Sequence, residues 1–155
     1  MGVSSNRTGI LIIAITFIWF GLVFGISFIE APLKFTAPNI TLPLGLGIGK
    51  IVFGALNKIE IAFSSAVLVY FFVGKFPKKV VYFYATLILI VAIQTVWLTP
   101  ILSERADALI AGKEISKSSH HSIFIVLEII KLVLLLISGI ILLNRIKSRN
   151  IPTRN

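Results

Sequence analysis

The sequence contains no cysteine and few charged residues, and each absence excludes classes of protein. Because there is no cysteine, disulfide-relay chemistry of the quinone-linked kind is excluded. Charged residues make up 14% of the 155 residues, whereas an ordinary soluble domain has about 25%. With 57% hydrophobic residues and a mean hydropathy of +1.00, the chain is too apolar for a soluble globular enzyme, a disordered regulator or a nucleic-acid-binding module.

Long apolar runs are what the sequence has instead. A helix that crosses a bilayer needs about 20 largely apolar residues. Four stretches meet this requirement: Gly9–Phe28, Ile51–Val73, Val80–Leu98 and Ile123–Leu143. They predict an all-α, polytopic membrane protein, a four-transmembrane-helix bundle in which residues 1–155 form a single membrane domain.

Acidic residues are scarce as well, with 6 Asp+Glu against 15 Lys+Arg and a formal net charge of +9. In so apolar a chain the excess indicates membrane topology, because Lys and Arg collect on the cytoplasmic side of membrane proteins. One predicted side carries basic residues and no acid: Arg7, Lys75, Lys78, Lys79, Arg145, Lys147, Arg149 and Arg154. The other side carries a mixture: Lys34, Arg105, Lys113 and Lys117 with Glu30, Glu104, Asp107 and Glu114. This bias predicts a multi-pass protein of the cell membrane with both termini in the cytoplasm.

The two predicted outer connections are rich in helix-breaking residues. The segment Ala31–Gly49 holds three prolines and three glycines in an apolar context. We interpret it as an interfacial or re-entrant segment over the outer mouth of the bundle, since irregular backbone at membrane depth must be buried in protein or line water. In the second connection, Pro100 predicts a break before an amphipathic helix over Ile101–Ala111. Two GxxxG pairs, Gly21 with Gly25 and Gly45 with Gly49, predict faces for close helix packing.

Polar side chains inside the predicted spans are the strongest indication of function. A charged side chain at the bilayer centre costs about 2.5–3.5 kcal/mol on insertion scales, so such residues usually face the bundle interior, find partners and serve a function. Counting residues along each helix places the polar groups in or at the mouth of the outer half of the bundle. We expect the following residues to line an outward-facing ligand-binding pocket: Glu30, Asn57, Glu60, Gln94, His121, Glu128 and Lys131.

Helical phase predicts which of these groups share a face. Lys131 follows Glu128 at i+3, close enough to pair with it. His121 is seven residues before Glu128 and nearly eclipsed with it, so the three should form one polar face. A structural alternative stays open, in which Glu128–Lys131, and Glu60 with Lys50 or Asn57, are buried pairs that only set helix register.

Three chemistries fit such a pocket. The leading hypothesis is binding or transport of a small solute or ion, with Glu60 and Glu128 as proton-titrating groups and Lys131 as their charge partner. A metal site built from Glu60, His121 and Glu128 is disfavoured, because the Glu-x-x-His spacing is absent and Lys131 would repel a cation. The alternatives are a membrane-embedded enzyme acting on a lipid or quinone-like substrate, with Glu128 or His121 as general acid or base, and an accessory subunit of a larger complex or a homo-oligomer. Whether the protein uses a cofactor stays unknown from the sequence.

The assembled motifs also resemble those of a known group of proteins. They are Ser27–Pro38, Gly45–Glu60, the turn Trp97-Leu-Thr-Pro100, and His121 with Glu128. Over most of the chain they resemble small uncharacterised bacterial four-helix integral membrane proteins, with a looser similarity to the transmembrane-protein-205-like group. Glu128 departs from the neutral amide expected in the wider group. The resemblance implies a four-helix integral membrane protein and carries no biochemical activity with it.

Overall fold

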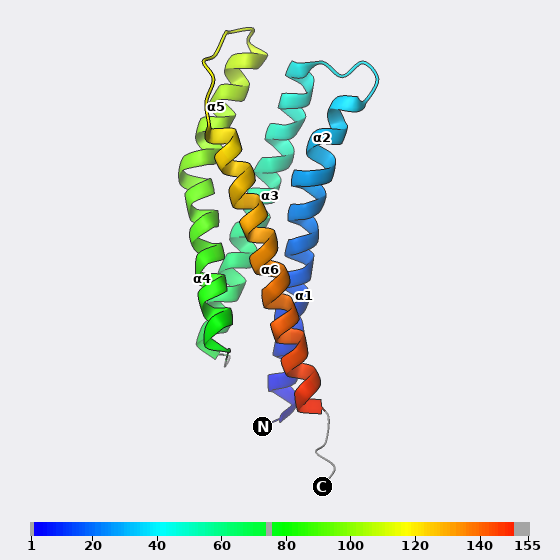
Figure 1. Ribbon diagram of the computed structural model, residues 1–155, viewed down its shortest axis with the longest axis vertical. Coiled ribbons are helices and arrows are strands. Elements are labelled where there is room, and N and C mark those ends of the chain that lie inside the picture. Colours follow the sequence, from blue (N-terminus) through cyan, green and yellow to red (C-terminus); the bar gives the residue numbers. More distant parts are fainter. Residues whose placement is uncertain (1, 74–75, 151–155) are drawn as a thin grey trace.

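The computed structural model describes residues 2–73 and 76–150, which are almost entirely helical and contain no strand (Figure 1). They form four long rods, each a single helix or an unbroken series of helices. The first rod joins α1 (Gly2–Phe24), the π-helix η1 (Gly25–Glu30), α2 (Ala31–Leu33) and the 3₁₀ turn η2 (Lys34–Thr36). The second is α3 (Leu42–Val73). The third joins α4 (Lys78–Ile93), the π-helix η3 (Gln94–Leu98) and α5 (Thr99–Ile110). The fourth is α6 (His120–Asn150).

Each rod contains a helix long and apolar enough to cross a membrane. These helices cover Gly9–Thr36, Leu42–Phe72, Lys78–Ile110 and His120–Ser148. The outer surface of the bundle is correspondingly apolar, with Phe72 91% exposed and Val96 79% exposed. The prediction of an all-α chain with four potential membrane spans is therefore confirmed, and the architecture is compatible with a multi-pass membrane protein.

The rods run alternately up and down, so the bundle has two distinct ends (Figure 1). The start of α1, the end of α3, the start of α4 and the end of α6 lie at one end, which we call the terminal end. Residues 37–41 and 111–119 connect the rods at the other, the loop end. Two basic residues used to predict topology, Lys75 and Arg154, lie outside the described residues. The shared end of the two termini agrees with their predicted common side; which side of the membrane that is stays a prediction.

The prediction of an irregular segment over Ala31–Gly49 is wrong for most of its length, because only residues 37–41 are non-helical. Asn39 turns the chain there with a positive φ of 64°, a conformation that Asn tolerates better than most residues. Pro43 lies in the first turn of α3, where its missing N–H has no intrahelical partner to lose. The segment is therefore a tight helical hairpin.

Two prolines that we expected to break helices instead lie just after π-helical turns. A proline inside a helix removes one hydrogen bond, and its ring meets the carbonyl of the residue four positions earlier. For Pro32 that residue is Phe28, and for Pro100 it is Val96; Phe28 lies inside η1 and Val96 inside η3. The wider π turn, with its i→i+5 bonding, gives the ring room and lets each rod continue.

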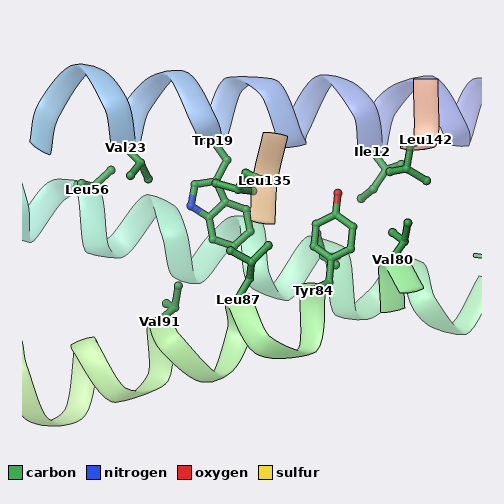
Figure 2. Close-up of a cluster of buried hydrophobic side chains, with 11 residues drawn as sticks. Ile12, Trp19, Val23, Leu56, Val80, Tyr84, Leu87, Val91, Leu135 and Leu142 are labelled. Carbon is green, nitrogen blue, oxygen red and sulfur yellow. The ribbon is translucent and has the colours of Figure 1, made fainter. Parts of the chain in front are cut away.

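A closely packed cluster of apolar side chains lies in the interior of the bundle. Trp19 of α1 lies beside Leu87 of α4 and Leu135 of α6, and Val23 lies about one helical turn further along α1; all four side chains are fully buried (Figure 2). α6 packs against both α1 and α4, and α3 packs against α4, α5 and α1. All four rods therefore enclose one common interior.

The two predicted GxxxG faces have different environments. A Cβ added at Gly45 would lie 2.2 Å from Cε1 of Phe35, and one at Gly49 would lie 2.9 Å from Nζ of Lys34, so this pair lets η2 fold back onto α3. Around Gly21 and Gly25, nothing lies within 4 Å of the corresponding positions. The Gly45–Gly49 face is therefore used within the chain.

Alanine substitution should distinguish these two faces. We expect Gly45→Ala to lower the free energy of unfolding by about 1–3 kcal/mol, because Phe35 or the hairpin must shift to make room. Gly21→Ala is the matched control and should be neutral or stabilise by up to about 1 kcal/mol, since Ala is the better helix former. Unfolding of both variants in mixed detergent micelles measures the difference, and equal stabilities would contradict the assigned packing.

Candidate functional site

Two buried glutamates share one buried lysine at the centre of the bundle. Nζ of Lys131 lies 2.5 Å from Oε1 of Glu60 and 2.6 Å from Oε1 of Glu128. The exposed fractions of Lys131, Glu128 and Glu60 are 0%, 1% and 3%. We call these three residues the charge triad. The predicted i+3 pair of Glu128 and Lys131 is confirmed, and α3 contributes the second carboxylate.

Three further side chains donate hydrogen bonds to the triad from the remaining rods. Nε1 of Trp19, in α1, donates to Oε1 of Glu60 at 2.9 Å. Nε2 of Gln94, in η3, donates to Oε1 of Glu128 at 2.8 Å. Oγ of Ser27, in η1, donates to Oε2 of Glu128 at 2.8 Å. The triad therefore contacts all four rods. A change in its charge would alter a hydrogen bond or an ion pair made by each rod.

Both π-helices contribute directly to this site. Ser27 lies within η1 and Gln94 is the first residue of η3. A π turn shifts the angular position of the residues that follow it, and such turns are frequent at functional sites. Since the turns themselves lie just before Pro32 and Pro100, these two prolines help to place the donors to Glu128.

The triad is unbalanced in charge when every member is ionised. Two carboxylates and one ammonium group sum to a net charge of −1, and an uncompensated charge in a water-free interior is costly. One additional proton or monovalent cation makes the site neutral. The arrangement can therefore bind and release one positive charge.

Gln94 is suited to both charge states of Glu128. Among the described residues its buried Oε1 has no hydrogen-bond partner, while its Nε2 donates to the carboxylate. A glutamine amide carries a donor and an acceptor on the same planar group. Turned over, Gln94 would accept a hydrogen bond from a protonated Glu128.

Asn57 and Glu30 lie outside the direct contacts of the triad, toward the loop end. Nδ2 of Asn57 donates to Oγ1 of Thr95 at 2.8 Å, which ties α3 to η3. Glu30 pairs with Lys34 at 3.3 Å, and both are partly buried. These two predicted site residues are therefore second neighbours at most, engaged in contacts of their own.

His121 does not join the predicted polar face. It is exposed, because α6 begins at His120 and His121 occupies the first turn at the rim of the bundle. Its neighbour His120 contacts Ser118 through Nδ1 and meets the edge of Trp97. Within residues 2–73 and 76–150, no group of three or more His, Cys, Asp or Glu side chains lies close enough to hold a metal ion.

The alternative pairing of Glu60 with Lys50 is also wrong. Nζ of Lys50 lies 2.6 Å from Oδ2 of Asp107, an exposed pair between α3 and α5. The phase of α3 alone could not reveal this, because the partner lies on another rod. Sequence reasoning also missed Trp19 and Ser27 as partners of the triad. The available signal for an irregular turn near Ser27 was Pro32, a proline inside a continuing apolar run.

Comparison with protein-family models, with curated proteins and with solved structures finds no match for this chain. The function is therefore inferred from the geometry and charge of the triad.

Proposed function

We propose that the charge triad is a proton-exchanging centre through which this protein binds and moves a small solute or ion across the cell membrane. The observation that carries the proposal is the shared lysine: Glu60 and Glu128 both contact Lys131, and all three side chains are buried. A pair that only set helix register would need one acid and one base. The second carboxylate adds a site for one exchangeable positive charge.

The surroundings of the triad favour this function over a purely structural one. The charged side chains of α3 and the first rod that lie nearest the triad among the described residues are paired or exposed: Glu30 pairs with Lys34, Lys50 pairs with Asp107, and Lys58 is exposed. They lie toward the loop end, which faces outward in the orientation predicted from the basic residues. A proton or cation arriving from outside would therefore meet the triad as its first buried charge.

Because the triad contacts all four rods, a change in its charge can change how the rods pack against one another. Protonation of Glu128 would weaken its ion pair with Lys131 and change what Gln94 and Ser27 can donate to. Those two donors lie in π-helical turns, where the backbone bonding is already irregular. We infer that binding of one positive charge changes the packing of the rods at this level, as coupled transport requires.

The test removes the charges and keeps the shape. The triple variant Glu60→Gln/Glu128→Gln/Lys131→Met should fold, since replacing a buried ion cluster by neutral groups of similar volume is often neutral or stabilising. In liposomes it should take up protons after an external acid pulse no faster than protein-free liposomes, measured with an internal pH dye. Its infrared difference spectrum between acidic and alkaline buffer should lack the protonated-carboxyl band expected of the wild type.

A matched control makes the same charge change on the surface. Glu104→Gln/Glu114→Gln/Lys113→Met also removes two acids and one lysine, all three of them exposed. This variant should behave as the wild type in both measurements. Wild-type proton uptake by the triad variant, or a wild-type protein with neither uptake nor a titrating carboxyl band, would show that the triad is only structural.

A further inference from the structure

Two buried serine hydroxyls lie on the terminal-end side of the triad and are not used by it. Among the described residues, Oγ of Ser64 and Oγ of Ser138 have no hydrogen-bond partner. Their side chains are nevertheless buried, with 6% of Ser64 and 0% of Ser138 exposed. An unsatisfied buried hydroxyl costs about 1–3 kcal/mol, and proteins usually avoid this cost with an internal water molecule. Each serine therefore points to a bound water.

The contacts between rods place Ser138 level with Tyr84. Gln94 of η3, which continues α4, meets Glu128 of α6, and α4 and α6 run in opposite directions. Tyr84 precedes Gln94 by as many residues as Ser138 follows Glu128. Both side chains are fully buried, so both face the shared interior at the same level.

Thr16 of α1 lies at this level too. A Cβ added at Gly139, next to Ser138, would lie 2.8 Å from the ring of Phe17, next to Thr16. The hydroxyl of Thr16 donates to the carbonyl oxygen of Ile12 at 2.6 Å and also meets the hydroxyl of Tyr84. Because the single proton of Thr16 is already engaged, Tyr84 is the donor in that contact. The oxygen of Tyr84 then remains able to accept a further hydrogen bond.

Ser64 lies between this level and the triad. It follows Glu60 by one helical turn on α3, toward the terminal end, and both residues are buried. We call Thr16, Ser64, Tyr84 and Ser138 the hydroxyl layer. Beyond it the interior is apolar, closed by Ile12, Val80 and Leu142 (Figure 2).

We propose that the hydroxyl layer holds internal water molecules and passes protons between the charge triad and the terminal end of the bundle. The proposal rests on the proposed function and names the proton as the ion that is moved. A proton leaves a triad carboxyl for a bound water and passes along the bound waters, which the hydroxyls of Ser64, Ser138 and Tyr84 hold in place, while Thr16 fixes Tyr84. The triad is left with a charge of −1 until a proton from the loop end restores it. Apolar residues on both sides of the layer keep this path closed at rest: Trp19, Leu87 and Leu135 toward the triad, and Ile12, Val80 and Leu142 toward the terminal end.

The sequence offers closely matched controls for a test in liposomes. Ser138→Ala with Tyr84→Phe removes two hydroxyls of the layer and keeps the aromatic ring. Ser65→Ala with Tyr82→Phe makes the same chemical changes at exposed positions. Acid-driven proton uptake should fall by about tenfold or more in the first double variant, as expected when positioned proton-transfer groups are lost. It should be unchanged in the second.

Two additional readouts keep the outcomes separate. Thermal unfolding should show the double variant Ser138→Ala/Tyr84→Phe to unfold cooperatively at a temperature close to that of the wild type, so that slower uptake is not due to misfolding. The infrared carboxyl band of the triad should remain in the hydroxyl variants. Equal uptake in the two double variants, with the carboxyl band present, would overturn the relay and leave the proposed function standing. Absence of the carboxyl band from the wild-type spectrum would instead overturn both the relay and the proposed function.

Discussion

Replacing Lys131 with methionine should cause the largest loss of stability of any single substitution in the bundle, about 3–5 kcal/mol in the free energy of unfolding. The wild-type ammonium group lies 2.5 Å from one carboxylate and 2.6 Å from the other, with no exposed surface. Without it, Glu60 and Glu128 would face each other as two uncompensated charges away from water. Unfolding in mixed detergent micelles, at a pH where exposed carboxyls are ionised, measures this loss.

Three comparisons make the prediction specific to the triad. Glu60→Gln should be much milder than Lys131→Met, because the balanced pair of Glu128 and Lys131 remains. The neutral triple variant should recover most of the stability, since no unpaired charge is left in the interior. Lys50→Met removes an exposed pair with Asp107 and should change stability by only about 0–1 kcal/mol. A Lys131→Met protein as stable as Lys50→Met would mean that the triad is not charged in the way we describe.

Trp19→Ala is expected to have the second-largest effect, about 3–5 kcal/mol. The indole of Trp19 is fully buried and lies between α1 and α4 near Leu87 and Leu135 (Figure 2). Its removal would leave a cavity in the common interior and take away the hydrogen bond from Nε1 to Glu60. Both losses weaken the same level of the bundle, so the unfolding free energy should show their combined effect.

A second substitution separates volume from hydrogen bonding at this position. Trp19→Phe keeps most of the ring volume and loses only the donor to a charged acceptor, so its cost should be about 1.5–3 kcal/mol. The matched control is Trp97→Ala, since Trp97 is 46% exposed and meets only the edge of His120 among the aromatic contacts described. If Trp97→Ala proved as damaging as Trp19→Ala, the interior position of Trp19 would be wrong.

Features that depend on neighbours in the sequence were predictable. Apolar run length identified the four spans, although the rods extend beyond the predicted limits. The i+3 spacing identified the ion pair of Glu128 with Lys131, because both residues lie on one helix face. Gln94 and Glu60 were also correctly expected to lie with these two, since helix depth alone placed all of them at one level.

Features that depend on contacts between rods were not predictable. Glu60 was considered as a partner of Lys50 or Asn57 on its own helix, whereas it pairs with Lys131, since rotation of α3 about its axis is set by its packing. His121 shares a helical phase with Glu128, yet it lies in the first turn of α6 and is exposed. Helical phase predicts which residues share one face of a helix. It does not predict how far the neighbouring rods extend along that face and bury those residues.

The sequence by itself determined that the chain is four apolar helices with a few charges inside them, because hydropathy and helical periodicity are local properties. The tertiary structure alone decided that two of these acids meet one lysine. It also decided that Pro32 and Pro100 follow π-helical turns instead of breaking their rods, because neighbouring rods supply the contacts that keep a locally unfavourable turn in place. The scarcity of charge left four helices apolar enough to span a membrane, and the packing of the rods placed Glu60, Glu128 and Lys131 in direct contact.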